Sequence, residues 1–185
     1  MRPLSNNNLY YLNSAILIII FQVVIPFTLI LIIRNVFISC NSAQKINPNY
    51  DSIVDTYDFK GPLNGIMSAF KAHPDKSWLV VAVDLPFVSQ DILTTLLSHR
   101  DSNYLATCFF NSDYNFPEPL LSIWEPSSFA MLRTYCEGGG RSPREFLTKH
   151  RTKLIDLTDR LILRGFNTKE ELEELKGKEK TKAKS

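Results

Sequence analysis

The chain has 185 residues, of which 44% are hydrophobic and 22% are charged, and its formal net charge is +2 at pH 7. This length fits one domain with a hydrophobic core, and so small a net charge gives no argument for nucleic-acid binding. The three cysteines include no C-x-x-C pair, so the sequence signals neither a disulfide framework nor a cysteine zinc site, and a reducing compartment is the default expectation.

Residues 1–34 differ in character from the rest of the chain. Ala15–Ile33 contains no charged residue, and a helix of this length spans roughly 28 Å, close to the thickness of a bilayer core. A membrane anchor through residues 15–33 is therefore one interpretation, although Pro26 would kink such a helix. Two alternatives stay open: a pair of buried core elements such as a strand and a helix, or a reading frame that begins in the wrong place.

From residue 35 onwards, short apolar runs alternate with segments of helical periodicity. We expect strands over 35–40, 52–55, 78–83, 104–110, 120–124 and 153–157. We expect helices from Gly61-Pro62 to His73, after an N-cap at Ser89, over 127–136, from Pro143 to His150, and after 168. Asn111–Pro119 is predicted to be a polar, proline-bearing loop.

This alternation predicts an α/β fold, a three-layer domain with a mostly parallel sheet, over residues 35–176. Residues 1–34 form an apolar leader ahead of this domain. Residues 177–185 are expected to be a disordered, lysine-rich tail.

Asp84 is the first candidate functional residue. It follows the apolar run Trp78–Val83, and Leu85-Pro86 then ends the strand. Open α/β sheets bind ligands at the carboxyl edge of their strands, so a carboxylate at that position can hold a metal ion or a ligand. The alternative is an aspartate that only caps the next helix.

Three further segments could converge on the same edge. Gly61-Pro62-Leu63-x-Gly65 opens a helix, where glycines allow a ligand to approach the backbone. Gly138–Arg144 places Arg141, Ser142 and Arg144 around a turn, which suits an anion, although solvated arginines on a flexible loop are the alternative. Asn167 could offer an amide oxygen to a hard cation, or could simply belong to a turn.

Five motifs occur in the order found in MobA-like nucleotidyltransferases, which the region from about Asn35 to Leu175 resembles. The similarity is greatest to the molybdenum cofactor guanylyltransferases. The motifs are Gly61-Pro62-Leu63-Asn64-Gly65-Ile66, Val83-Asp84-Leu85-Pro86-Phe87, Pro119–Trp124, Arg141–Leu147 and Phe166–Leu172.

The resemblance implies a Rossmann-like nucleotidyltransferase fold and transfer of GMP from GTP to molybdenum-molybdopterin in the cytoplasm, with release of pyrophosphate. Asp84 matches the family's Mg²⁺-binding aspartate. Asp55, Gly61, Pro62, Leu63 and Gly65 match the nucleotide-binding segment. Arg141, Ser142, Arg144 and Asn167 match the region that faces the phosphate of molybdopterin.

The chain departs from the family at its beginning. The family starts with a strand and a loop of the form Leu-x-Gly-Gly-x-Ser-x-Arg-Met-Gly, which cradles the triphosphate, whereas this chain has no glycine before Gly61. Loss of that loop would remove much of the charge stabilisation needed for catalysis. Two alternatives therefore stay beside the guanylyltransferase hypothesis: a non-catalytic membrane-anchored or partner-binding remnant of the same fold, and a nucleotidyltransferase for another phosphorylated acceptor or for CTP.

Overall fold

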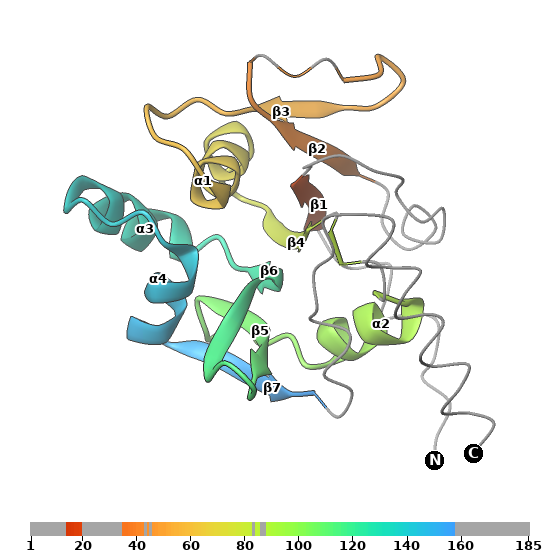
Figure 1. The fold of residues 1–185 in the computed structure, drawn as a ribbon, viewed down its shortest axis with the longest axis vertical. Helices are drawn as coiled ribbons and strands as arrows, with labels where there is room; N and C mark the ends of the chain where they lie inside the picture. Colours follow the sequence, from red (N-terminus) through yellow and green to blue (C-terminus); the bar gives the residue numbers. More distant parts are fainter. Residues whose placement is uncertain are drawn as a thin grey trace.

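A computed structural model describes residues 14–19, 35–42, 44, 46–82, 84–85 and 88–157 of the chain. Within these residues, four helices pack on a sheet of strand order β3-β2-β1-β4-β6-β5-β7 (Figure 1). The strands are β1 (Ser14–Ile19), β2 (Val36–Cys40), β3 (Ser52–Val54), β4 (Ser77–Ala82), β5 (Ala106–Asn111), β6 (Phe116–Trp124) and β7 (Thr152–Asp156). The helices are α1 (Pro62–Ala72), α2 (Gln90–Ser98), α3 (Ser128–Glu137) and α4 (Pro143–Lys149).

The sheet is mostly parallel, as the sequence predicts. The pairs β1–β2, β1–β4, β2–β3 and β5–β7 are parallel, whereas β6 runs antiparallel to both β4 and β5. The connections lead from β1 to β2 and β3 on one side, and then through α1 to β4 on the other side of β1. This reversal between β1 and β4 is the kind of switch point at which open α/β sheets bind ligands.

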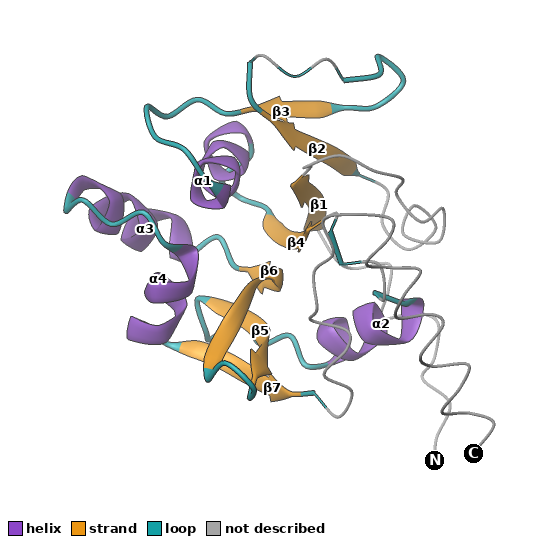
Figure 2. Cartoon of the chain, viewed as in Figure 1, coloured by secondary structure: helices purple, strands orange, loops and turns teal. Residues whose placement is uncertain are grey.

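Helices cover both faces of the sheet, so the predicted three-layer α/β fold is confirmed. Figure 2 shows α2 on one side and α1, α3 and α4 on the other. The alternation along β4 explains both layers: Trp78 and Val80 pack with the α1, α3 and α4 side, and Leu79 and Val81 pack with the α2 side.

β1 is an internal strand of the sheet, between β2 and β4. It lies within the segment that the sequence analysis separates as an apolar leader, and it pairs with β2 over four residues and with β4 over six. The remaining positions of that leader, and hence most of the proposed anchor, lie outside the described residues. Among the helices that the structure describes, none combines the length and the apolar character needed to cross a bilayer.

The helix starts follow from local sequence signals: those at Pro62 and Pro143 and the cap at Ser89 confirm the predictions, and the helix expected after residue 168 lies outside the described residues. α1 begins with Pro62 directly after Gly61, which has a φ of 106° that favours glycine. The Ser89 hydroxyl accepts a hydrogen bond from the Ile92 amide at the start of α2, and the Ser142 hydroxyl accepts one from the Glu145 amide at the start of α4.

The prediction of a loop over Asn111–Pro119 is wrong for its second half. β5 and β6 form a tight hairpin, and β6 already begins at Phe116. β4 pairs only with Leu121–Trp124 of β6. Pro117 and Pro119 precede this paired stretch, so the edge of β6 that faces β4 needs no backbone hydrogen bond from either proline. The hairpin therefore carries β6 past the carboxyl end of β4.

A charged pair lies at the opposite end of β4. The Arg100 Nε donates to Glu125 Oε1 over 2.6 Å, Arg100 Nη2 donates to Oε2 over 2.8 Å, and the Ser77 hydroxyl donates to the same carboxylate over 2.7 Å. Glu125 is buried, and these partners compensate its charge. This network fixes the amino end of the sheet and leaves the carboxyl edge as the candidate site.

Candidate functional site

Asp84 lies just beyond the carboxyl end of β4, beside the switch point between β1 and β4, and it is exposed. β6 is antiparallel to β4 and pairs Leu121 with Val81, so the residues before Leu121 extend towards Asp84. The sheet thus brings Glu118 of β6 close to Asp84. Sequence analysis predicts the position of Asp84 but misses Glu118, because it treats that stretch as loop.

Glu118 is partly buried and its pKa is raised. Burial is the main cause, and the negative charge of Asp84 raises it further, whereas a hydrogen bond from the Leu120 amide (3.1 Å) and the positive charge of Arg144 act in the opposite direction. Asp84 at the end of β4 and Arg144 of α4 therefore both lie within electrostatic range of Glu118 on β6.

The Asp84 edge fits a magnesium ion that is shared with substrate phosphates. Mg²⁺ is commonly held by one or two carboxylates together with phosphate oxygens and water. Among the described residues, no group of three or more His, Cys, Asp or Glu side chains could hold a metal ion alone. Asp84 with the nearby Glu118 is thus suited to a site that the substrate completes.

Asp55 follows β3 at the same edge and lies beside Gly65. A Cβ built on Gly65 would overlap the Ser39 hydroxyl and would lie 3.8 Å from Asp55 Oδ1, so only glycine lets α1 approach β2 this closely. Asp55 is partly buried, and this burial raises its pKa. The Asp55 carboxylate therefore lies beside the Gly65 turn of α1.

The motif that opens α1 acts mainly through its backbone. Gly61 is exposed and has open space around its Cα, whereas the Leu63 side chain is fully buried in the core. Leu63 can therefore offer only backbone atoms to a ligand. Pro62 begins the helix and leaves the backbone of Gly61 accessible.

Asn64 holds the loop that leads into this motif, which sequence analysis does not anticipate. Its side-chain amide donates to the backbone oxygens of Tyr57 (2.8 Å) and Phe59 (2.6 Å), and its Oδ1 accepts from the Tyr57 amide (3.2 Å). Ser68, one turn later, accepts a hydrogen bond from the Thr56 amide over 2.9 Å. A polar residue at a buried helix position is the signal that could have revealed this role.

The arginine segment contacts the loop before α1 and the first residue of β6. The Arg141 guanidinium lies over the Phe59 ring, 4.7 Å from its centroid, and Nη1 donates to the backbone oxygens of Cys136 and Gly140. Arg144 lies over the Phe116 ring with Cζ 3.4 Å from the centroid. The fold therefore brings the predicted nucleotide segment, the arginine segment and the Asp84 edge into one continuous region.

Two other predicted residues are placed differently. The Ser142 hydroxyl caps α4, and its backbone amide and oxygen contact the Tyr135 hydroxyl, so Ser142 has a structural role in the described region. Asn167 lies outside the described residues, as do the positions that follow β1, where the family has its glycine-rich loop.

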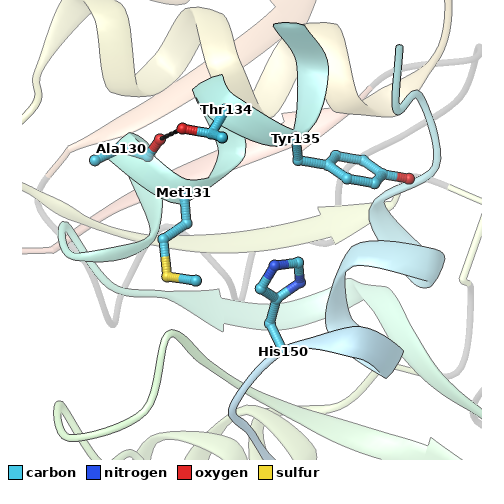
Figure 3. Close-up of a pocket in the computed structure, with 5 residues that line it drawn as sticks. All are labelled: Ala130, Met131, Thr134, Tyr135 and His150. Atoms are coloured by element: carbon cyan, nitrogen blue, oxygen red, sulfur yellow. Dashed lines mark hydrogen bonds between the residues drawn. The ribbon is translucent and has the colours of Figure 1, made fainter. Parts of the chain in front are cut away.

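A hollow of about 330 Å³ lies elsewhere, between α3 and the C-terminal end of α4 (Figure 3). Its lining residues are Ala130, Met131, Thr134, Tyr135 and His150. The His150 ring stacks on Phe146 at 4.1 Å, and its Nδ1 lies 2.8 Å from the Phe146 oxygen. This lining offers no carboxylate for a cation, so the charged carboxyl edge is the better candidate for phosphate chemistry.

Comparison with known proteins finds relatives of this chain both by sequence and by fold. A curated relative, the molybdenum cofactor biosynthesis bifunctional protein of Synechocystis sp., is 26% identical over 123 residues, which are 66% of this chain and 35% of that protein. The chain therefore spans about a third of the length of this relative.

Two solved structures share the fold. Molybdopterin-guanine dinucleotide biosynthesis protein A of Archaeoglobus fulgidus superposes with a TM-score of 0.65 at 18% identity, covering 87% of this chain and 96% of that one. A protein of Aquifex aeolicus superposes with a TM-score of 0.65 at 12% identity, covering 85% of this chain and 95% of that one. At these identities the similarity concerns the fold alone.

The family assignment rests on a match to the whole central part of the chain. The model of the MobA-like NTP transferase domain matches residues 28–154, which include β2 to α4 and the candidate residues Asp55, Gly61–Gly65, Asp84, Arg141 and Arg144. The chain belongs to the family of MobA-like NTP transferase domains.

Proposed function

We propose that this protein transfers GMP from GTP to the terminal phosphate of molybdopterin, as a nucleotidyltransferase of molybdenum cofactor biosynthesis. An oxygen of the acceptor phosphate attacks the α-phosphorus of GTP, the bond to the β-phosphate breaks, and pyrophosphate leaves. The supporting observation is that Asp84, Arg144 and the Gly61–Gly65 segment lie along one carboxyl edge in a MobA-like domain. The names of the Synechocystis and Archaeoglobus relatives favour this substrate class.

The roles of the residues follow from their chemistry. Asp84, with Glu118 near it, would hold Mg²⁺, which neutralises phosphate charge and aligns the attacking and leaving oxygens. Gly61, which has open space around it, would let the nucleotide approach the backbone, Gly65 holds α1 close to Ser39 of β2, and Asp55 can accept hydrogen bonds from a base or a ribose. Arg141 and Arg144 supply positive charge for the acceptor phosphate, and Asn167 would add an amide near the acceptor.

The compartment is part of the same proposal. All three cysteines of the chain are free, and free buried thiols are typical of the reducing cytoplasm.

A non-catalytic role in the same fold is the second candidate. It is favoured by the absence of glycine from the first 60 residues, where the family has its phosphate-cradling loop. Binding without turnover would support this candidate, and binding that CTP competes for better than GTP would indicate a different nucleotidyltransferase.

Asp84→Ala tests the proposal directly. Titration calorimetry of the full-length chain with GTP and Mg²⁺ should show at least tenfold weaker binding for this variant, because the remaining carboxylate cannot hold the cation alone. Asp75→Ala is the matched control, since Asp75 is exposed at the opposite end of β4, and its affinity should stay within about twofold of the wild type. Absence of GTP binding by the wild type with Mg²⁺ would contradict the catalytic proposal.

A further inference from the structure

Arg141 and Arg144 are held by different kinds of contact. Arg141 uses Nη1 to bind two backbone oxygens, at 2.7 Å (Cys136) and 2.6 Å (Gly140), in addition to lying over the Phe59 ring. Arg144 is exposed, and within the described part of the chain its guanidinium makes no hydrogen bond; its ring contact with Phe116 is the one that fixes it. The donors of Arg144 therefore remain available for a ligand.

The ring beneath Arg144 belongs to a well-defined turn. Asn111 Oδ1 accepts hydrogen bonds from the amides of Asp113 (3.2 Å) and Tyr114 (3.3 Å), and Asn115 has a left-handed φ of 55° that asparagine tolerates. Tyr114 stacks on Phe116 with ring centroids 5.7 Å apart. Phe116 is thus fixed at the first position of β6 and presents a defined face to α4.

Arg144 lies at the carboxyl edge of the sheet. Leu121 of β6 pairs with Val81 of β4, so Phe116, the residue under Arg144, belongs to the part of β6 that extends past the carboxyl end of β4. Asp84 is the proposed Mg²⁺ ligand, and a guanidinium at the same edge of the sheet can bind a phosphate that the metal also contacts.

We propose that Phe116 is a positioning residue, whose ring holds the guanidinium of Arg144 at the carboxyl edge of the sheet so that it binds a phosphate group of the substrate. The identity of that substrate rests on the proposed function. An exposed arginine samples many rotamers, and an aromatic ring below the guanidinium restricts them before the ligand arrives. Phosphate affinity should therefore depend on the ring, and only while Arg144 is present.

A double-mutant cycle on the full-length chain tests this coupling. The variants are Phe116→Leu, Phe116→Tyr, Arg144→Gln and the double variant Phe116→Leu/Arg144→Gln. Two probes are used: inorganic phosphate followed by NMR titration, and GTP with Mg²⁺ followed by calorimetry. An effect on inorganic phosphate assigns Arg144 to the acceptor phosphate, and an effect confined to GTP assigns it to the nucleotide phosphates; both support the proposal.

We expect Phe116→Leu to weaken binding of the affected probe about fivefold, and Phe116→Tyr to keep it within twofold of the wild type. In the Arg144→Gln background, Phe116→Leu should change nothing further, because the ring acts through the arginine. Equal losses in both backgrounds would overturn the proposal, since they indicate a general effect on folding. Unchanged affinity for both probes, or no binding of either probe by the wild type, would also overturn it.

A measurement without ligand checks the geometry independently. The ring current of Phe116 should shift the Arg144 side-chain NMR signals upfield in the wild type and in Phe116→Tyr, but not in Phe116→Leu. Phe59→Leu is the matched control, since it removes the ring below Arg141 and should leave the Arg144 signals in place. Arg144 signals that do not respond to Phe116→Leu would refute the positioning role.

The two proposals fail in different ways. If GTP with Mg²⁺ does not bind but phosphate binding depends on Phe116 through Arg144, the guanylyltransferase proposal fails and the positioning role stands. If GTP binding depends on Asp84 but neither probe responds to Phe116→Leu, the positioning role fails alone.

Discussion

Three carboxylates at the carboxyl edge of the sheet differ in how far they are exposed to solvent. Asp84 is exposed, whereas Asp55 and Glu118 are partly buried, and burial raises the pKa of both. Exposure suits Asp84 to an incoming cation. Partial burial suits Asp55 and Glu118 to hydrogen bonding or to pairing with a neighbouring positive charge. Carboxylates at one edge of the sheet therefore differ in role because they differ in exposure.

The environment of Asp55 predicts a stability effect at the residue scale. Its pKa in the folded chain lies above the ordinary value of 3.8, so the folded state holds this proton to higher pH than the unfolded state does. The contribution of Asp55 to stability is therefore fully present below pH 3.8 and is lost as the pH rises through the raised value. We expect Asp55→Asn to increase the free energy of unfolding at neutral pH, and to make its decline on the acidic side steeper, because the stabilising protonation of Asp55 is lost.

Urea unfolding at a series of pH values between 3 and 7 measures this effect. Asp58→Asn is the control for loss of one negative charge from the same loop, because Asp58 is exposed. Parallel pH profiles for Asp55→Asn and the wild type would show that burial of Asp55 does not carry the effect.

At the scale of elements, the position of α1 depends on two residues, Gly65 and Asn64. Gly65 has no Cβ, which lets the helix approach Ser39 of β2, and Asn64 supplies hydrogen bonds to the preceding loop. The Gly-Pro-Leu-Asn-Gly motif therefore fixes the height of α1 over β2 and β3 as well as the shape of its first turn. This spacing sets the distance between Asp55 and the helix.

Gly65→Ala tests this packing. In the wild type the new Cβ overlaps the Ser39 hydroxyl, so we expect the free energy of unfolding to fall by about 1–2 kcal/mol despite the better helix propensity of alanine. In a Ser39→Ala background only the Ser39 Cβ position, at 3.4 Å, remains close, and Gly65→Ala should become neutral or stabilising by up to about 1 kcal/mol. Urea denaturation of the four variants measures the difference, and an equal penalty in both backgrounds would contradict the steric explanation.

At the scale of the whole molecule, the continuity of the sheet depends on β1. β2 and β3 lie on one side of β1, and β4, β6, β5 and β7 lie on the other. Without β1, β2 and β4 would each lose a parallel partner, and the candidate nucleotide segment would be separated from the Asp84 edge.

A chain that lacks residues 1–34 should therefore fail to fold cooperatively. We expect it to lose the sigmoidal urea transition and the near-ultraviolet circular dichroism of the full-length protein, since the two halves of the sheet have no other strand between them. The control is removal of residues 177–185, the predicted lysine-rich tail, which should leave the transition unchanged. A shortened chain with the unfolding midpoint of the full-length protein would show that β1 is dispensable and would favour a separate leader segment.

Local chemistry made several elements readable from the sequence. Proline after Gly61, the serine cap at Ser89, proline at the start of α4, and an apolar run ending at Asp84 act through neighbours in the chain, so their signals survive without knowledge of the tertiary fold. The α/β class is also predicted locally, because short apolar runs typical of strands alternate with segments of helical periodicity. The position of Asp84 at the carboxyl edge then follows from strand direction alone.

Only the tertiary structure decided which partners meet at that edge. Phe116 and Glu118 fall in a stretch whose prolines predict a loop, yet β6 runs antiparallel to β4 and carries both residues to the Asp84 edge. The physical reason is that strand order and direction depend on hydrogen bonds between residues far apart in the chain, which no local pattern records. The sequence by itself determined most of the elements and the position of Asp84, and long-range pairing decided that Glu118 lies near Asp84 and that Phe116 lies under Arg144.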